Sequence, residues 1–243
     1  MRPRAVTTLA AAAILFGANQ THAAALQVAP VRIQVDVPAA ASTITVSNPG
    51  STPITAQLRV YKWTHKNGKD ELVATRDVVA SPPLTQLAPG QPYVVRIVRV
   101  VKQPVNGEEA YRLLVDEIPS ESAPAPSFGP RFAIRQSIPV FFTDPAAAPK
   151  LSWGAAIKNG KIFLEARNEG GKRVRISALK IMNSSGGAIS VGKDFAGYVF
   201  GRSTEQWTVP AGSKGFAAGG TITILAQGEN GPIKATARIS AAN

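Results

Sequence analysis

The sequence contains no cysteine and only two histidines, His22 and His65. Without cysteine there is no disulfide bond, thiolate nucleophile or thiolate metal site. His22 lies in a segment that we expect to be cleaved off, so a Ser-His-Asp triad or a histidine metal site would depend on His65 alone. His65 stands beside a Lys-Asn-Gly turn, and we predict it to be a solvated loop residue. We therefore predict a protein that is not an enzyme and has no metal ion or cofactor.

Long hydrophobic runs are also absent, since no stretch beyond the first 25 residues is continuously apolar for the roughly 18 residues of a membrane helix. At the start, Arg2 and Arg4 precede a short apolar run over Leu9–Phe16, and small residues follow up to Ala25. This pattern is typical of a secretory signal peptide. We predict a signal peptide over residues 1–23, with cleavage after Ala23 or Ala24, and an exported mature protein.

Helical periodicity is missing as well, because no segment keeps the helical spacing of apolar residues for about ten residues. Apolar and polar residues instead alternate in short segments, such as Val31 to Val37 and Ile54 to Trp63. Asn-Gly turns at Lys66–Lys69 and Lys158–Lys161 indicate hairpins. We predict an all-β protein of two sandwich domains, over residues 24–143 and 150–243, with a Pro/Ala-rich joint at residues 144–149.

The charge is strongly one-sided but not concentrated. The full chain carries a formal charge of +12, and removal of Arg2 and Arg4 with the signal peptide lowers it to +10. Proteins that bind nucleic acids cluster basic residues with aromatics or along a helix, whereas these are scattered through strands and loops. We therefore predict no nucleic-acid partner, and favour a protein partner that is acidic or presents a carboxylate.

Two further patterns offer no catalytic site. The glycine pairs at Gly170, Gly186 and Gly219 lack the strand-to-helix setting of a phosphate-binding loop, and we interpret them as turns. Asp116 and Glu117 are neighbours in a predicted strand. Their side chains point to opposite faces, so they cannot act together on one bond.

The stretch Arg131–Phe142 is the most informative part of the chain. Phe132 and Ile134 fall on one face of the predicted strand, and a second apolar run leads from Ile138 to the joint. Pro139 has no N–H for a strand partner, which indicates an edge strand. Because a long apolar edge promotes aggregation, we expect another protein to pair with it.

Several motifs in fixed order resemble the periplasmic chaperones of the chaperone–usher pilus pathway, the PapD-like family. The resemblance covers nearly the whole mature chain and is tightest between Leu26 and Phe142. The Ser-Ile-Pro-Val-Phe form of the last strand looks like the divergent, archaic branch. The motifs are Leu26-x-Val-x-Pro-x-Arg32, Asn48 after a strand, Pro82-Pro83, Leu87-x-Pro89-Gly90 and Glu117-Ile-Pro119.

This resemblance implies two immunoglobulin-like domains in a boomerang arrangement that bind pilus subunits in the periplasm and deliver them to an outer-membrane usher. Each subunit lacks its last strand, and the chaperone inserts its own strand into the gap, which is donor-strand complementation. We expect the donor strand near residues 128–142, with Phe128, Phe132 and Ile134 as the donor side chains. A free chaperone could also cover this edge by forming a dimer.

The resemblance also implies a basic pair in the interdomain cleft that binds the subunit's C-terminal carboxylate. Arg32 matches the first cation of this pair. Better-known members carry a lysine at the position that aligns with Pro139, and proline cannot supply charge. Arg112 or Arg135 could supply the second cation, and we favour Arg112.

Two other function classes compete with a chaperone. An exported sandwich that binds carbohydrate or another surface ligand as an adhesin would show aromatic or acidic residues in its loops, and the mature loops are poor in both. A hydrolase on a β scaffold would need more histidine than this chain has. We predict the pilus-assembly chaperone.

Overall fold

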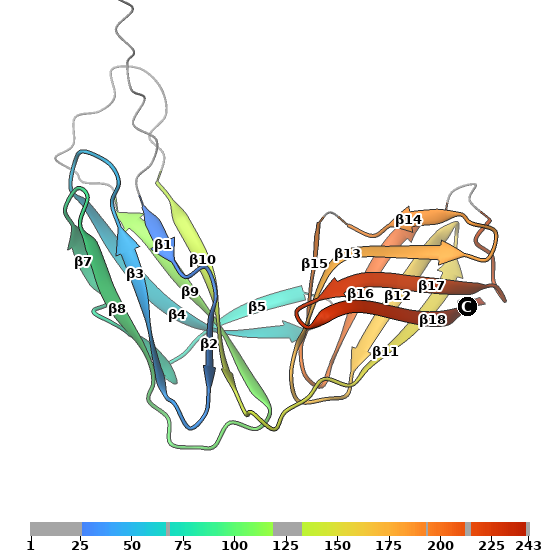
Figure 1. Ribbon diagram of the computed structural model, residues 1–243, viewed down its shortest axis with the longest axis horizontal. Coiled ribbons are helices and arrows are strands. Elements are labelled where there is room, and N and C mark those ends of the chain that lie inside the picture. The colour runs from blue at the N-terminus through green and yellow to red at the C-terminus, as the bar shows by residue number, and fades with distance from the viewer. Residues whose placement is uncertain (1–25, 67–68, 119–132, 193, 212–214, 242–243) are drawn as a thin grey trace, which may run out of the picture.

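The computed structural model (Figure 1) describes residues 26–66, 69–118, 133–192, 194–211 and 215–241. Over these ranges the chain forms β-strands joined by turns and loops. They include no helix long and apolar enough to span a membrane. The strands form two lobes that meet at an angle, each with its own hydrophobic core. The fold is therefore all-β, with two immunoglobulin-like sandwiches in a boomerang arrangement, as the sequence predicted.

The N-terminal lobe is a sandwich of two sheets. One sheet has the spatial order β1 (Gln27–Ala29), β3 (Ala41–Ser47), β8 (Pro92–Arg99) and β6 (Val78–Ser81). The other has the order β2 (Ile33–Asp36), β10 (Arg135–Thr143), β9 (Glu108–Ile118), β4 (Ile54–Lys66) and β5 (Lys69–Ala74), and β7 (Leu84–Leu87) also pairs with β4.

Alternating apolar residues of the facing sheets fill the space between them. Ile44 and Val46 of β3 are buried from one side, and Leu113 and Val115 of β9 from the other. Every second residue of a strand points to the same face, so this alternation turns one face of each sheet into core. The alternation read from the sequence thus explains the sandwich.

The C-terminal lobe folds around a second core. Its strands follow the order β14 (Ala188–Ser190), β13 (Val174–Asn183), β17 (Thr221–Gly228), β18 (Gly231–Ala241), β11 (Leu151–Lys158), β12 (Lys161–Asn168) and β16 (Ser203–Pro210), and β15 (Phe195–Val199) pairs with β13. The predicted hairpin at Lys158–Lys161 joins β11 to β12, with positive φ at Asn159 and Gly160. The chain passes from the first core to the second over residues 144–150.

His65 differs from the prediction of a solvated loop residue. It lies near the end of β4, and its side chain is only 7% exposed. Its Nδ1 is 3.1 Å from Oδ1 of Asp70, and its Nε2 is 2.9 Å from Oε2 of Glu205 without the alignment of a hydrogen bond. The reason is that β4 and β5 extend beyond their own sheet toward the C-terminal lobe, which supplies Glu205 (Figure 1).

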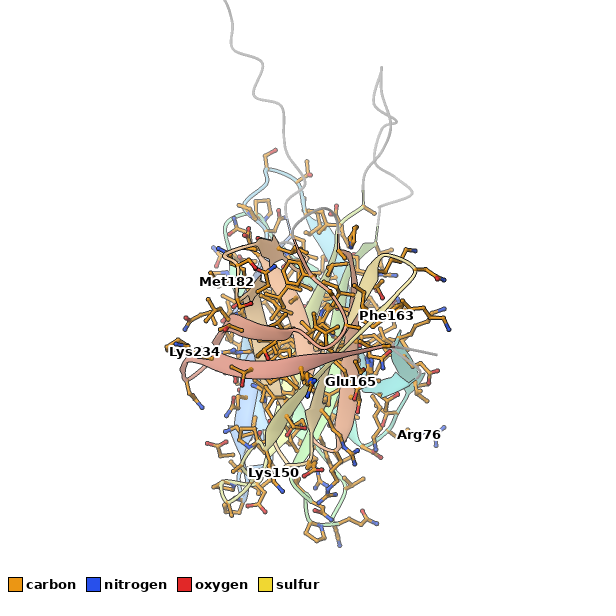
Figure 2. All side chains as sticks on the ribbon, turned by 90° about the vertical axis from the view of Figure 1, so that its right-hand side faces the viewer. Arg76, Lys150, Phe163, Glu165, Met182 and Lys234 are labelled. Carbon is orange, nitrogen blue, oxygen red and sulfur yellow. The ribbon has the colours of Figure 1, made fainter. Side chains whose placement is uncertain are left out.

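In Figure 2, Lys150 and Lys234 at the C-terminal lobe and Arg76 of the N-terminal lobe point outward at well-separated places. All three are exposed.

Candidate functional site

The N-terminal segment changes sheets immediately before Arg32. Strand β1 pairs with β3 in one sheet, and β2, which starts at Ile33, runs parallel to β10 in the other. Pro30 lies between the two strands and interrupts the alternation. Because Val140 is the register partner of Ile33, the preceding residues Arg32 and Pro139 lie next to each other.

Arg32 faces the C-terminal lobe. Its side chain is 44% exposed, and its Nη1 lies 2.5 Å from Oε1 of Glu229. Glu229 occupies the turn between β17 and β18. The guanidinium therefore lies where the two lobes meet.

A cleft of about 640 Å³ opens beside Arg32. Both lobes contribute to its walls, so it exists only when the lobes are placed against each other. Its lining comprises Pro30, Val31, Arg32, Pro139, Arg175, Tyr198, Gly228 and Glu229. Sequence reasoning found Arg32 and Pro139 but missed Arg175, Tyr198 and Glu229. Nothing local marks these three, since they reach the cleft only through the packing of the lobes.

Strand β10 has an open edge next to this cleft. It pairs with β9 along its whole length, but with β2 only from Val140 to Thr143. From Arg135 to Pro139 its outer side has no strand partner among the described residues. The part of β10 nearest the predicted donor residues is therefore free to accept a strand (Figure 1).

The hydrogen bonds at the two ends of β10 show which residues face this open edge. The carbonyl of Ile134 accepts from Glu117 of β9 at 2.9 Å, and that of Thr143 accepts from Val37 on the β2 side at 3.0 Å. Since successive residues point their polar groups to alternate sides, Arg135, Ser137 and Pro139 point theirs outward. The missing N–H of Pro139 therefore removes no hydrogen bond between β10 and β9.

Ile134 corrects one expectation about the donor side chains. A donor side chain would point into the subunit, yet Ile134 is partly buried against the N-terminal core of the chaperone itself. It shares a strand face with Ile138, Val140 and Phe142, which are fully part of the core. Phe128 and Phe132, the other two predicted donor residues, lie outside the described residues.

Arg112 is close to the cleft but does not line it. It is the register partner of Pro139, so both side chains share one face of the sheet. Its Cζ lies 3.6 Å from the ring centre of Trp63, and it makes no hydrogen bond or ion pair with a described residue. Burial lowers the pKa of Arg112. The guanidinium is held over an aromatic ring, one strand away from Pro139.

Arg135 lies farther from the cleft and is already engaged. It forms an ion pair with Asp116, its register partner on β9, and Arg59 bonds the same carboxylate at 2.6 Å. Burial raises the pKa of Asp116, but the bonds from Arg135 and Arg59 outweigh it and leave the pKa below its usual value. The strand separates Arg135 from Pro139 by four residues, which is about 13 Å along an extended chain.

A buried arginine, Arg173, fixes the two lobes behind the cleft. Its side chain is fully buried and forms an ion pair with Glu108 of β9. Its Nη2 lies 3.0 Å from Gln34 of β2 and 3.3 Å from Glu229 of its own lobe. Its Cζ lies 3.4 Å over the ring of Phe141. Sequence reasoning missed Arg173, because nothing in the neighbouring sequence distinguishes a buried arginine from an exposed one.

Nothing in this region has the features of a metal site. Among the described residues, no group of three or more His, Asp or Glu side chains is placed to hold a metal ion. The cleft instead gathers cations and an open strand edge. Such an arrangement suits recognition of a protein segment.

Comparison with known proteins agrees with this arrangement. Residues 25–148 match the family model described as "Pili and flagellar-assembly chaperone, PapD N-terminal domain". A search of the curated proteins finds no match.

Solved structures of pilus chaperones have the same fold. The chaperone–tip adhesion subunit complex of CsuC and CsuE, from archaic Csu pili of Acinetobacter baumannii, matches with a TM-score of 0.65 and 25% identity, over 90% of this chain and 100% of that one. The Salmonella enterica SafB chaperone, solved with the SafA pilin, matches with a TM-score of 0.63 and 19% identity, over 88% of this chain and 97% of that one. The E. coli chaperone DraB matches with a TM-score of 0.60 and 20% identity, over 86% of this chain and 97% of that one.

The family match spans half of the chain, from the start of the N-terminal lobe to the joint. It includes β1, β2 and β10, the strands that form the switch and the open edge. The chain therefore belongs to the family of pilus-assembly chaperones with a PapD-type N-terminal domain.

Proposed function

We propose that this protein is a periplasmic chaperone that captures pilus subunits by donor-strand complementation and passes them to an outer-membrane usher. A signal peptide over residues 1–23 exports it, and it acts by binding rather than by catalysis. The observation that carries this proposal is the open edge of β10 beside the cleft that contains Arg32.

The open edge supports strand addition. Arg135 and Ser137 each point a backbone N–H and a C=O toward the open edge. A strand of the subunit would form hydrogen bonds with these groups. The same edge invites self-association, so we propose that the free chaperone forms dimers until a subunit replaces the second copy.

The donor side chains would come from the segment that enters β10. We propose Phe128, Phe132 and Ile134, which would occupy the place of the subunit's missing strand. Ile134 is already partly buried against the N-terminal core. The exposed part of its side chain would pack against the core of the subunit. Burying such a side chain contributes about 1.5–3 kcal/mol.

The anchor for the subunit's C-terminal carboxylate is Arg32. A planar guanidinium can bind both carboxylate oxygens, and Arg32 keeps 44% of its side chain exposed in the cleft. The geometry supports Arg112 and Arg135 less, because one lies over Trp63 and the other is paired with Asp116.

Co-expression of the chaperone with a candidate pilus subunit tests this function. The amount of complex isolated from the periplasm is the readout. Arg32→Ala should leave the chaperone folded and weaken the complex by about 2–3 kcal/mol, which is roughly 30- to 150-fold in affinity. Arg112→Ala and Arg135→Ala are the comparisons. Equal recovery of complex with Arg32→Ala would contradict the anchor.

The donor segment needs a separate variant. Phe132→Ser should reduce recovery of the complex sharply while the melting temperature of the free chaperone stays unchanged. Ala133→Ser, on the opposite strand face, is the matched control. Loss of folding in Phe132→Ser would place Phe132 in the chaperone's own core and contradict its role as a donor.

A further inference from the structure

His65 lies where the β4–β5 hairpin meets the C-terminal lobe (Figure 1). Its side chain is 7% exposed, and that of Glu205 on β16 is 17% exposed. Asp70, the register partner of His65 on β5, contacts the other nitrogen of the imidazole. An ionisable ring is therefore held between two carboxylates, one from each lobe.

Both ring nitrogens of His65 face carboxylate oxygens. Nδ1 lies 3.1 Å from Oδ1 of Asp70, and Nε2 lies 2.9 Å from Oε2 of Glu205. A neutral imidazole has one N–H and one lone pair, so it can donate to only one of these oxygens. Its other nitrogen would then direct a lone pair at a negatively charged oxygen. Only the doubly protonated imidazole offers a donor to both carboxylates.

The environment of Glu205 also favours a positive charge at this contact. Burial raises the pKa of Glu205, and the charge of His65 acts against this shift. An ionised Glu205 is therefore unfavourable in the assembled contact unless a cation lies beside it. Protonated His65 supplies that cation.

The other charged groups around His65 have partners of their own. Those that share a cleft of about 330 Å³ with it, or lie on β9 beside β4, are Lys62, Glu108, Glu109, Arg112 and Arg202. Their partners are, in the same order, Asp77, Arg173, Arg99, the ring of Trp63 and Asn106. The charge balance of the contact is therefore set by His65, Asp70 and Glu205.

We propose that His65 is a pH-dependent clamp between the two lobes. The protonated ring joins Asp70 to Glu205 and holds the β4–β5 hairpin against the C-terminal lobe. Histidine changes its charge between about pH 5 and pH 8. The contact takes up a proton as it forms, so its stability is present in mild acid and is lost as the pH rises. Because both lobes line the cleft beside Arg32, the same titration should change the width of that cleft.

Distances between two spin labels test the clamp on the mature protein. The sequence has no cysteine, so Val73→Cys on β5 and Thr208→Cys on β16, both exposed, give two unique labelling sites. From about pH 5.5 to about pH 8, the distances should spread, and the ratio of separated to joined states should rise about tenfold. An unchanged distribution over this range would overturn the clamp.

Three variants assign the response to this contact. His65→Gln keeps a polar side chain that does not titrate, so its distances should be the same at both pH values. Glu205→Gln removes one of the two carboxylates and should reduce the response. Glu71→Gln, on the exposed strand beside Asp70, is the control and should respond like wild type.

Two results would contradict the assignment to His65. A His65→Gln variant that responds like wild type would place the titrating group elsewhere. A Glu71→Gln variant that loses the response would show that the overall charge of the hairpin, and not this contact, controls the lobes. Thermal unfolding of each variant at both pH values shows whether the fold is intact.

Discussion

Single charged residues inside the N-terminal lobe link its stability to pH. Arg99 is almost buried and holds Glu109 with two bonds of 2.8 and 2.9 Å, and the hydroxyl of Tyr111 donates to the same carboxylate at 2.9 Å. Burial raises the pKa of Glu109, but Arg99 and Tyr111 outweigh it, so the pKa lies below its ordinary value of 4.5. The folded state thus favours the ionised carboxylate.

A lowered carboxyl pKa has a defined sign for stability. The contribution of Glu109 is present above its ordinary value of 4.5 and is lost as pH falls through the lower folded value. Glu109→Gln should therefore lower the free energy of unfolding by about 2 kcal/mol near pH 7. The variant should also lose less stability than wild type as the pH falls below 4.5, because it has no carboxylate to protonate at this position. Urea unfolding at several pH values measures both effects. Glu71→Gln, on exposed β5, is the control, and parallel pH curves for wild type and Glu109→Gln would contradict the assignment.

At the scale of elements, the alternation of apolar and polar residues predicted the strands better than it predicted the residues of the cleft around Arg32. The sequence located the edge at Pro139, because a proline in a strand has a direct consequence for hydrogen bonding. It could not reveal that Arg175 and Glu229 face Arg32, because those residues lie in a different lobe. Local pattern also misjudged His65, which is covered by packing between the lobes.

The extension of β4 places Trp63 against the C-terminal lobe. Its ring lies edge-on to Phe200 at 4.7 Å and to Tyr198 at 5.5 Å, both at 88°. From the N-terminal lobe, the ring centre of Phe141 lies 6.1 Å from that of Trp63, and Cζ of Arg112 lies 3.6 Å from it. Trp63 therefore joins the sheet that contains β10 to the second lobe.

Replacing Trp63 with alanine should remove this joint. The side chain is 4% exposed, so the cavity and lost contacts should cost about 3–5 kcal/mol. Because the contacts cross between lobes, calorimetry should show one coupled transition for wild type and two separate transitions for Trp63→Ala. Leu72→Ala on exposed β5 is the control. A single transition at the wild-type temperature would show that Trp63 does not couple the lobes.

At the scale of the whole molecule, the angle between the lobes depends on Arg173. Its buried guanidinium contacts β2, β9 and β10 of the first lobe and Glu229 of the second. Arg173→Met keeps an apolar stem but leaves the carboxylates of Glu108 and Glu229 without this partner. Removing one member of a buried ion pair costs about 3–5 kcal/mol.

The expected result for Arg173→Met is a changed shape as well as lower stability. Small-angle X-ray scattering should report a wider spread of interlobe distances, and subunit capture should fall because the cleft walls separate. Arg167→Met, an exposed arginine of β12, controls for loss of charge. An unchanged scattering curve together with normal capture would show that other contacts set the angle.

The central claim is that a pilus subunit adds a strand to the open edge of β10. Residue-resolved amide hydrogen exchange tests it most directly. In the free protein, the amides of Gln136 and Ile138 bond to β9 and should exchange slowly, whereas those of Arg135 and Ser137 face the open edge and should exchange fast. In complex with the subunit, Arg135 and Ser137 should become as slow as their neighbours. If they exchange as fast in the complex as in the free protein, the subunit does not pair with β10.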